Sequence, residues 1–203
     1  MSSTPRRDTA IDFIRHGEPE GGRAFRGHNV DDPLSEKGWT QMWAAVGDAC
    51  PWSQIVSSPL VRCRAFAEAL SARHGIPCSV DDRIKEVGFG SWEGRTPDQL
   101  QRENPLEYAA FYADPLRNRP SGAEPLPAFF ARVASAFEEA TQRYAGGHVL
   151  MVAHAGVIRA AIAHVLRADP CAAYRVKVQN AGLTRFRCGA QGAVLEFHGR
   201  QRV

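Results

Sequence analysis

The stretch HVLMVAHAG, residues 148–156, joins an apolar run to a polar turn. The run from His148 to Ala153 predicts a strand buried on both faces, because its apolar residues do not alternate with polar ones. Beyond the turn, apolar residues recur at helical spacing on one face: Val157, Ile158, Ile162, Val165 and Leu166. The stretch therefore predicts a strand that passes directly into a helix, as in a sheet covered by helices.

A second junction between a predicted strand and a polar turn lies near the start of the chain. There the apolar segment Thr9 to Ile14 is followed directly by Arg15-His16-Gly17. Further strands are predicted at residues 55–57, 78–80, 183–186 and 194–197. Longer helices are predicted at 35–49, 58–75 and 126–144. This alternation predicts a three-layer α/β/α sandwich with a mostly parallel sheet of about six strands.

Short sequence motifs predict where several helices begin. Ser58-Pro59 offers a capping residue followed by proline at the first helical position. Thr96-Pro97-Asp98-Gln99 and Asn104-Pro105-Leu106-Glu107 each add Gln or Glu three residues after the cap. They predict two short helices within an insertion at about 96–125. Because no linker or repeat divides the chain, we expect residues 1–203 to form one domain.

Composition excludes several classes of protein. The 203 residues include 25 Lys and Arg and 22 Asp and Glu, and the net charge of +3 is too small and scattered to indicate nucleic acid or an anionic membrane. The longest apolar run, Val149 to Ala153, is far shorter than the roughly 20 residues that span a bilayer, and Met1 to Asp8 lacks a signal-peptide core. Five cysteines without Cys-x-x-Cys spacing indicate free thiols, so we expect a cytoplasmic protein.

Both junctions place a histidine at the carboxyl end of a strand, where open α/β sheets bind ligands. Gly17 and Gly156 let the backbone approach a ligand closely. The helix that follows offers unpaired N–H groups and a positive dipole end. With Arg15 beside His16, these features favour a phosphate ligand.

Arg62 falls in the first turn of the helix expected after Ser58, where a cation opposes the helix dipole by several tenths of a kcal/mol. A bound phosphate would reverse that effect. Taken alone, Arg62 is better interpreted as a solvated surface charge, Cys63 as a small buried residue, and Glu86 as one of many acids. Either histidine alone is more often structural than catalytic. Only their conjunction, in a fixed order, indicates a site.

That conjunction resembles the histidine phosphatase superfamily, the phosphoglycerate-mutase-like proteins. The matching motifs cover about residues 8 to 187 and are, in order, Arg15-His16-Gly17-Glu18, Pro33-Leu34-Ser35-Glu36-x-Gly38, Ser57-Ser58-Pro59-Leu60-x-Arg62, Glu86-x-x-Phe89-Gly90-x-Trp92-Glu93-Gly94, Pro120-x-Gly122-x-Glu124 and His154-Ala155-Gly156. Each motif alone has limited specificity, whereas six in the right order are specific.

The resemblance implies a role for each site residue. His16 is the expected nucleophile, which would become a phosphohistidine. Arg15, Arg62 and His154 would form the phosphate pocket, with the backbone of Gly156. Glu86 is the expected general acid. Its rival Glu93 matches a structural Trp-Glu-Gly turn of the family. No metal or cofactor is expected.

The loop after the first junction departs from the family, which often has an asparagine where this chain has residues 19–23, PEGGR. We therefore expect Arg26 or Gly27 to supply the contact from this loop to phosphate. The family's Gly-Gly-Glu is Gly122-Ala123-Glu124 here, a mild change.

The segment from Glu86 to Gly94 resembles the small phosphatases, among them the α-ribazole phosphatases, so we expect hydrolysis of a small-molecule phosphomonoester. A phosphoglycerate mutase is one alternative, but mutases resemble a longer chain and need further basic residues for a second phosphate, of which the sequence shows no cluster. A non-catalytic phosphate-binding module is the other, disfavoured because all five core residues are present.

The substrate cannot be identified from the sequence. We expect leaving-group recognition in residues 18–32 and 96–125. Tyr108, Phe111 and Tyr112 lie in the second segment, and their helical spacing favours packing over lining a pocket. The oligomeric state stays open, with a homodimer among the options.

Overall fold

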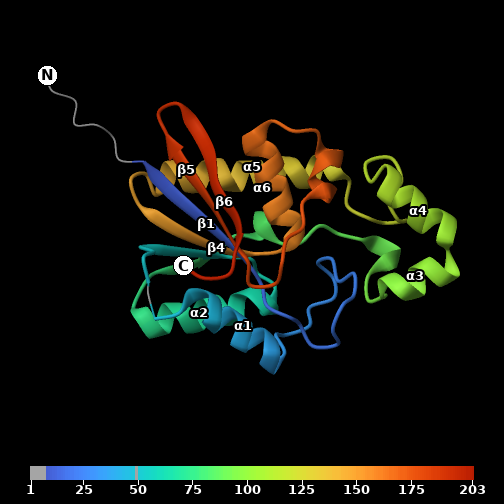
Figure 1. Cartoon of the computed structure of the whole chain (residues 1–203), viewed down its shortest axis with the longest axis horizontal. Helices are drawn as coiled ribbons and strands as arrows, with labels where there is room; N and C mark the ends of the chain where they lie inside the picture. The colour runs from blue at the N-terminus through green and yellow to red at the C-terminus, as the bar shows by residue number, and fades with distance from the viewer. Residues whose placement is uncertain (1–7, 49) are drawn as a thin grey trace, which may run out of the picture.

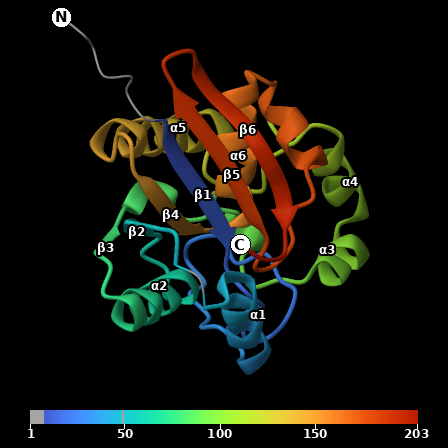
Figure 2. The ribbon, with the colours of Figure 1, turned by 60° about the vertical axis from the view of Figure 1, so that its left-hand side comes forward.

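The computed structural model describes residues 8–48 and 50–203, and a six-stranded sheet lies at its centre (Figure 1). The strands are β1 (Thr9–Arg15), β2 (Gln54–Ser57), β3 (Cys78–Val80), β4 (His148–Ala153), β5 (Leu183–Gly189) and β6 (Gly192–Arg200). Their order is β3-β2-β4-β1-β5-β6, with β6 at one edge (Figure 2). β3, β2, β4 and β1 are parallel, whereas β5 runs against both of its neighbours. The predicted mostly parallel sheet is confirmed.

Helices cover both faces of the sheet, which confirms the three predicted layers (Figure 1). The α-helices are α1 (Glu36–Val46), α2 (Val61–His74), α3 (Pro97–Glu103), α4 (Pro105–Ala113), α5 (Leu126–Arg143) and α6 (Ala155–Leu166). Three short 3-10 helices are η1 (Asp82–Ile84), η2 (Gly90–Trp92) and η3 (Pro170–Arg175). α1 and α2 pack on one face, and α5 and α6 on the other.

Strand β4 shows why its sequence is apolar without alternation. Val149, Met151 and Ala153 point into the cluster beneath α5 and α6. Leu150 and Val152 point into the cluster beneath α1 and α2. Because successive side chains leave a strand on opposite faces, a central strand between two helical layers must be apolar throughout.

Two of the predicted helices begin with a side-chain cap. The Ser35 hydroxyl accepts a hydrogen bond from the Gly38 N–H at the start of α1. Thr96 and Gln99 form a capping box at α3. α1 ends at Val46, before the predicted boundary, and residue 49 lies outside the described residues. α4 begins at Pro105 as predicted, without a side-chain cap from Asn104.

The predicted start of α2 at Ser58-Pro59 is wrong, because the helix begins at Val61. The Ser58 hydroxyl is engaged elsewhere, 2.7 Å from Nε2 of His154. The Asp31 carboxylate, from the loop after β1, instead accepts the N–H of Val61 at 2.8 Å. The helix start is therefore tied to that loop rather than to its own sequence.

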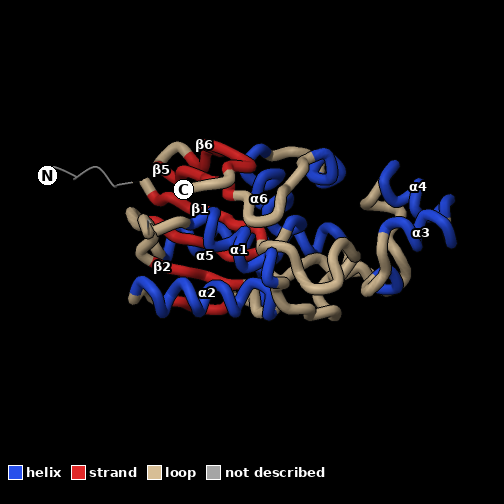
Figure 3. Tube along the Cα trace, turned by 60° about the horizontal axis from the view of Figure 1, so that its bottom comes forward, coloured by secondary structure: helices blue, strands red, loops and turns tan. Residues whose placement is uncertain are grey.

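The two short helices of the expected insertion, α3 and α4, stand beyond one end of the sheet (Figures 1 and 3). They pack through a small cluster of Trp92, Leu100 and Phe111, separate from the two main cores. Within the described ranges, no helix has the length and apolar character needed to cross a membrane.

Asp12 of β1 is a buried carboxylate that joins three parts of the chain. It accepts hydrogen bonds from Arg185 at 2.7 and 2.9 Å, from Trp52 at 2.8 Å, and contacts His148 Nε2 at 2.9 Å. Burial alone would raise its pKa, but the hydrogen bonds from Arg185 and His148 outweigh burial and lower it. The ionised form therefore stabilises the fold above the ordinary pKa of 3.8, and this stabilisation is lost as pH falls through the lowered value.

We expect Asp12→Asn to lower the free energy of unfolding at pH 7 by about 3 kcal/mol, because the guanidinium of Arg185 loses its buried partner. Urea unfolding at pH 7 and at pH 3 measures the effect, and the deficit should shrink at the lower pH. Glu196→Gln, which breaks the exposed pair with Arg187, is the control and should cost less than about 1 kcal/mol. Equal losses in the two variants would contradict this interpretation.

Candidate active site

Three adjacent parallel strands end together at one edge of the sheet. The N–H of His16, after β1, donates to the carbonyl of Ala153 in β4 at 3.0 Å. The N–H of Ser58, after β2, donates to Val152 of β4 at 3.0 Å. The register of the sheet thus brings His16, Ser58 and His154 side by side from three distant parts of the chain.

A cavity of about 600 Å³ opens at this edge. Of the residues predicted for the site, the cavity is lined by Arg15, His16, Gly27, Arg62, Glu86 and Gly156. His154 is fully buried and does not line it. Most of the residues predicted for the site therefore line one cavity, although they come from distant parts of the chain.

His16 has one ring nitrogen occupied and one free. Its Nδ1 lies 2.7 Å from the carbonyl oxygen of Gly17, which can only accept, so Nδ1 carries the proton and Nε2 keeps its lone pair. Burial, followed by the charges of Arg15 and Arg62, lowers the pKa of His16 well below its ordinary value of 6.5. The side chain is a neutral imidazole at neutral pH, the form that can act as a nucleophile.

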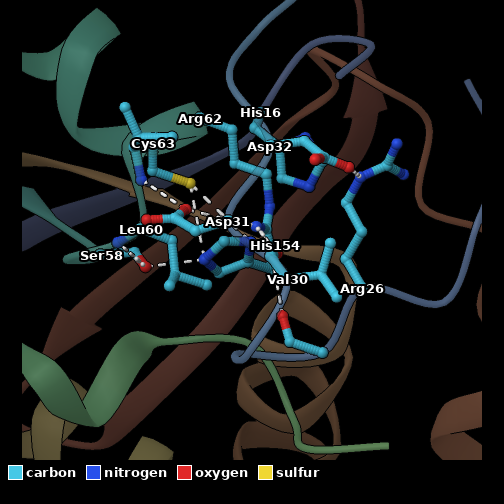
Figure 4. A network of polar contacts seen from close by, with 12 residues as sticks. His16, Arg26, Val30, Asp31, Asp32, Ser58, Leu60, Arg62, Cys63 and His154 are labelled. Atoms are coloured by element: carbon cyan, nitrogen blue, oxygen red, sulfur yellow. Dashed lines mark hydrogen bonds and ion pairs between the residues drawn. The ribbon is translucent and has the colours of Figure 1, made fainter. Parts of the chain in front are cut away.

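His154 packs against His16, with ring centroids 5.2 Å apart (Figure 4). Its Nε2 lies 2.7 Å from the Ser58 hydroxyl and 3.5 Å from the thiol of Cys63. Burial, then the charge of Arg62, lowers its pKa well below 6.5. In this arrangement His154 braces His16 from within the protein. Cys63 is fully buried, as expected, and burial raises its thiol pKa.

Arg62 is only 1% exposed, so its interpretation as a surface charge is wrong. Its Nη1 donates to the carbonyl of Val30 at 3.1 Å (Figure 4). Its Nη2 donates to the carbonyl of Gly27 at 2.9 Å. Its nearest carboxylate, Asp31, lies 3.7 Å away and is half exposed. The Nε–H is buried and has no partner among the described residues.

Arg15 shows the same incomplete bonding. Its Nη1 donates to the carbonyl of Val178 at 2.8 Å, while its buried Nε–H has no partner in the part of the chain described. Burial lowers the pKa of Arg15 to about 10. A buried charged donor without a partner is costly. Two such donors beside a neutral imidazole are suited to an anion that accepts hydrogen bonds.

Glu86 is held by two backbone amides, with Oε1 accepting from Val87 at 3.0 Å and Oε2 from Gly156 at 3.2 Å. A Cβ at Gly156 would lie 2.2 Å from Oε1, so only glycine admits the carboxylate there. The expectation that Gly156 binds phosphate through its backbone is thereby corrected, because its N–H is given to Glu86. Gly156 positions the carboxylate instead.

Glu93, the rival acid, lies outside the cavity lining. Its carboxylate accepts the N–H groups of Phe89 at 2.8 Å and Asn29 at 3.2 Å, and so joins two loops. Gly27 has a positive φ of 55°, and a Cβ there would lie 1.9 Å from Glu93 Oε1. These contacts give Glu93 a structural role, in keeping with its match to the Trp-Glu-Gly turn of the family.

The loop after β1 supplies acceptors rather than the expected phosphate donors. The Gly27 carbonyl accepts from Arg62, as described above. Arg26 is buried and donates to the Asp32 carboxylate and to the carbonyl of Gly22, both at 2.8 Å. Arg26 therefore holds the loop together, and the Gly27 carbonyl orients Arg62.

Three cations in the cavity lining were missed by sequence reasoning, namely Arg23, Arg159 and Lys177. They lie in segments far apart along the chain, so no cluster was visible. Arg159 lies in the second turn of the helix that follows His154, so it lacks the first-turn signal that Arg62 gave. Tyr112 also lines the cavity, whereas Tyr108 and Phe111 pack with Trp92 as expected.

No three His, Cys, Asp or Glu side chains within residues 8–48 and 50–203 are grouped as a metal site requires. The chemistry available at this edge is that of an imidazole, two arginines and a carboxylate. Together they can bind a phosphoryl group, accept it on nitrogen and exchange a proton with its ester oxygen.

Residues 11–201 match the family model of the histidine phosphatase superfamily (branch 1). The chain belongs to this family. Among curated relatives, it is 28% identical over 171 residues to the adenosylcobalamin/alpha-ribazole phosphatase of Salmonella typhimurium, which covers 82% of this chain and 84% of that protein. It is 29% identical over 189 residues to the bifunctional protein Rv2228c of Mycobacterium tuberculosis, covering 91% of this chain. The chain spans about half the length of that relative, 52%.

Solved structures show the same fold. The mycobacterial glucosyl-3-phosphoglycerate phosphatase Rv2419c is 28% identical, with a TM-score of 0.82 over 95% of this chain and 99% of that one. Bacillus stearothermophilus YhfR has a TM-score of 0.86 at 24% identity, over 94% and 96% of the two chains.

We expect phosphate or vanadate near 100 times its Kd to raise the Tm by about 5 to 10 °C, because a ligand that binds only the folded state stabilises it. Arg62→Gln should reduce this increase by at least half. Thermal unfolding with and without the anion measures the shift, whatever the starting Tm of each variant. Arg64→Gln on the exposed side of the same helix is the control. An undiminished shift in Arg62→Gln would remove Arg62 from the anion site.

Proposed function

We propose that this protein is a phosphoric monoester hydrolase that works through a phosphohistidine on His16. One observation carries the proposal: the free Nε2 of a neutral, buried imidazole shares a cavity with two arginines whose buried Nε–H groups have no partner among the described residues. A phosphoryl group in this cavity would balance the two guanidinium charges and lie within reach of the nucleophile.

In the first step, Nε2 of His16 attacks the phosphorus atom and the bond to the ester oxygen breaks. Arg15 and Arg62 stabilise the charge spread over the three remaining oxygens. Protonated Glu86 donates its proton to the departing alkoxide, which is too basic to leave unaided. The amides of Val87 and Gly156 fix the carboxyl group at the cavity wall for this transfer.

In the second step, water attacks the phosphohistidine. The Glu86 carboxylate, now ionised, takes a proton from the water, and the bond between nitrogen and phosphorus breaks to release inorganic phosphate. His16 returns to the neutral imidazole, whose Nδ1–H is still held by Gly17. His154, braced by Ser58, keeps the His16 ring in place throughout the cycle.

The substrate is proposed to be a small phosphorylated metabolite. α-Ribazole 5′-phosphate is the first compound to test, because the Salmonella relative carries the name of an α-ribazole phosphatase. One assay separates the alternatives. Phosphate release supports a phosphatase, isomerisation of phosphoglycerate without release supports a mutase, and tight binding of phosphate with neither reaction supports a non-catalytic module.

We expect His16→Ala to abolish phosphate release from p-nitrophenyl phosphate, because no other histidine of the described structure lines the cavity. His164→Ala is the matched control, since His164 lies on α6 beside Glu138, outside the site, and should keep full activity. Steady-state release and circular dichroism on both variants make the comparison. Turnover by a folded His16→Ala protein would contradict the assignment.

We expect Glu86→Gln to slow formation of the phosphoenzyme by about 10²–10⁴-fold with an alkyl phosphate and by less than about tenfold with p-nitrophenyl phosphate. The nitrophenolate is stable as an anion and needs no proton, whereas an alkoxide does. Burst kinetics must be used, because the later attack by water needs a base with either substrate. Equal losses would mean that Glu86 only positions the phosphoryl group, and Glu93→Gln would then be tested in the same way.

A further inference from the structure

The cavity holds more positive charge than a phosphoryl group needs. Beyond Arg15 and Arg62, its lining includes Arg23 from the loop after β1, Arg159 from α6 and Lys177 from the segment before β5. None of these three side chains forms an ion pair within the described residues. Segments far apart in the sequence therefore bring three unpaired cations to one cavity.

The carboxylates in the cavity lining do not offset this charge. They are Glu18 and Glu86. Glu18 is paired with Lys37, with Nζ 2.9 Å from Oε2. Glu86 is placed to exchange a proton with the ester oxygen. A phosphate dianion would be matched by Arg15 and Arg62, which leaves the charges of Arg23, Arg159 and Lys177 without a counterpart.

Arg159 is the best positioned of the three. Its Nε donates to the carbonyl of Val176 at 2.9 Å, and its guanidinium lies over the Tyr174 ring at 5.8 Å. No hydrogen bond from the described residues occupies its two terminal nitrogens.

The three cations differ in exposure. Arg23 and Lys177 are exposed, whereas Arg159 is partly buried. Salt and water screen exposed charges more strongly, so Arg159 should contribute the most to binding an anion. The cavity of about 600 Å³ also has room for a leaving group beyond the phosphoryl, beside Tyr112 and Tyr174.

We propose that Arg159, assisted by Lys177 and Arg23, binds an acidic group, either a carboxylate or a second phosphate, on the leaving alcohol of the substrate. This inference rests on the proposed phosphatase function and names its substrate class. It separates two kinds of metabolite, because the leaving alcohol of α-ribazole 5′-phosphate carries no acidic group.

The test compares substrates matched except for the acid. 3-Phosphoglycerate is paired with glycerol 3-phosphate, and fructose 1,6-bisphosphate with fructose 6-phosphate. We expect kcat/KM to be about 10- to 100-fold higher for at least one acid-bearing member, the range for a charge-assisted hydrogen bond in a partly buried site. The preferred pair identifies the acid as carboxylate or phosphate. α-Ribazole 5′-phosphate should behave as the neutral members do.

Arg159→Gln should bring that ratio of kcat/KM values towards one, and Lys177→Met and Arg23→Gln should lower it by less. Arg175→Gln is the matched control, since it removes a nearby exposed cation outside the cavity lining and should leave the ratio unchanged. Because each ratio is measured within one variant, a change in the amount of folded protein cancels.

Two outcomes would overturn the inference: a wild-type ratio near one for both pairs, or a ratio that Arg159→Gln leaves unchanged. If the protein still hydrolyses p-nitrophenyl phosphate in those cases, the proposed phosphatase function stands and only the acid subsite is lost. If no phosphomonoester is hydrolysed at all, it is the phosphatase function that fails.

Discussion

The site depends on an unbalanced electrostatic arrangement: a buried, neutral imidazole shares a cavity with two arginines whose hydrogen bonding is incomplete among the described residues. Burial and the charges of Arg15 and Arg62 keep His16 neutral. The same arginines each leave a buried Nε–H without a partner in the described structure. In the proposed reaction, an incoming phosphoryl group supplies the negative charge that balances the two guanidinium groups.

The rest of the fold holds this arrangement in place. The parallel strands β2, β4 and β1 bring Ser58, His154 and His16 to one edge. Ser58 holds His154, and His154 packs against His16. The loop after β1 holds Arg62 through two carbonyls. Because each part rests on backbone register or on a buried contact, the geometry is formed before a ligand arrives, as efficient charge stabilisation requires.

Much of the fold could be predicted from local sequence. The apolar run of β4 reflects burial on both faces, and the caps at Ser35 and Thr96 act within a few residues of where they occur. The Ser58 prediction failed because α2 begins only at Val61, whose N–H bonds to the carboxylate of Asp31, a partner far away in the sequence. A local rule cannot detect a competing tertiary partner.

The site residues likewise divide into those that the sequence predicts and those that depend on contacts with distant parts of the chain. Arg15, His16 and Glu86 could be predicted because their motifs appear in order. The burial of Arg62 depends on the carbonyls of a loop whose conformation the sequence does not reveal. Gly156 was expected to bind phosphate, and its amide turned out to hold Glu86. The group formed by Arg23, Arg159 and Lys177 emerges only once three segments are packed around one cavity.

The most direct test of this account is to identify the atom that carries the phosphoryl group. The enzyme would be denatured in alkali during turnover, because phosphohistidine is labile to acid, and the modified peptide examined by mass spectrometry and phosphorus NMR. The account requires the phosphoryl group on Nε2 of His16, since Nδ1 is bound to the Gly17 carbonyl. A phosphoryl group on Nδ1 or on another residue, or turnover without any phosphoenzyme, would contradict it.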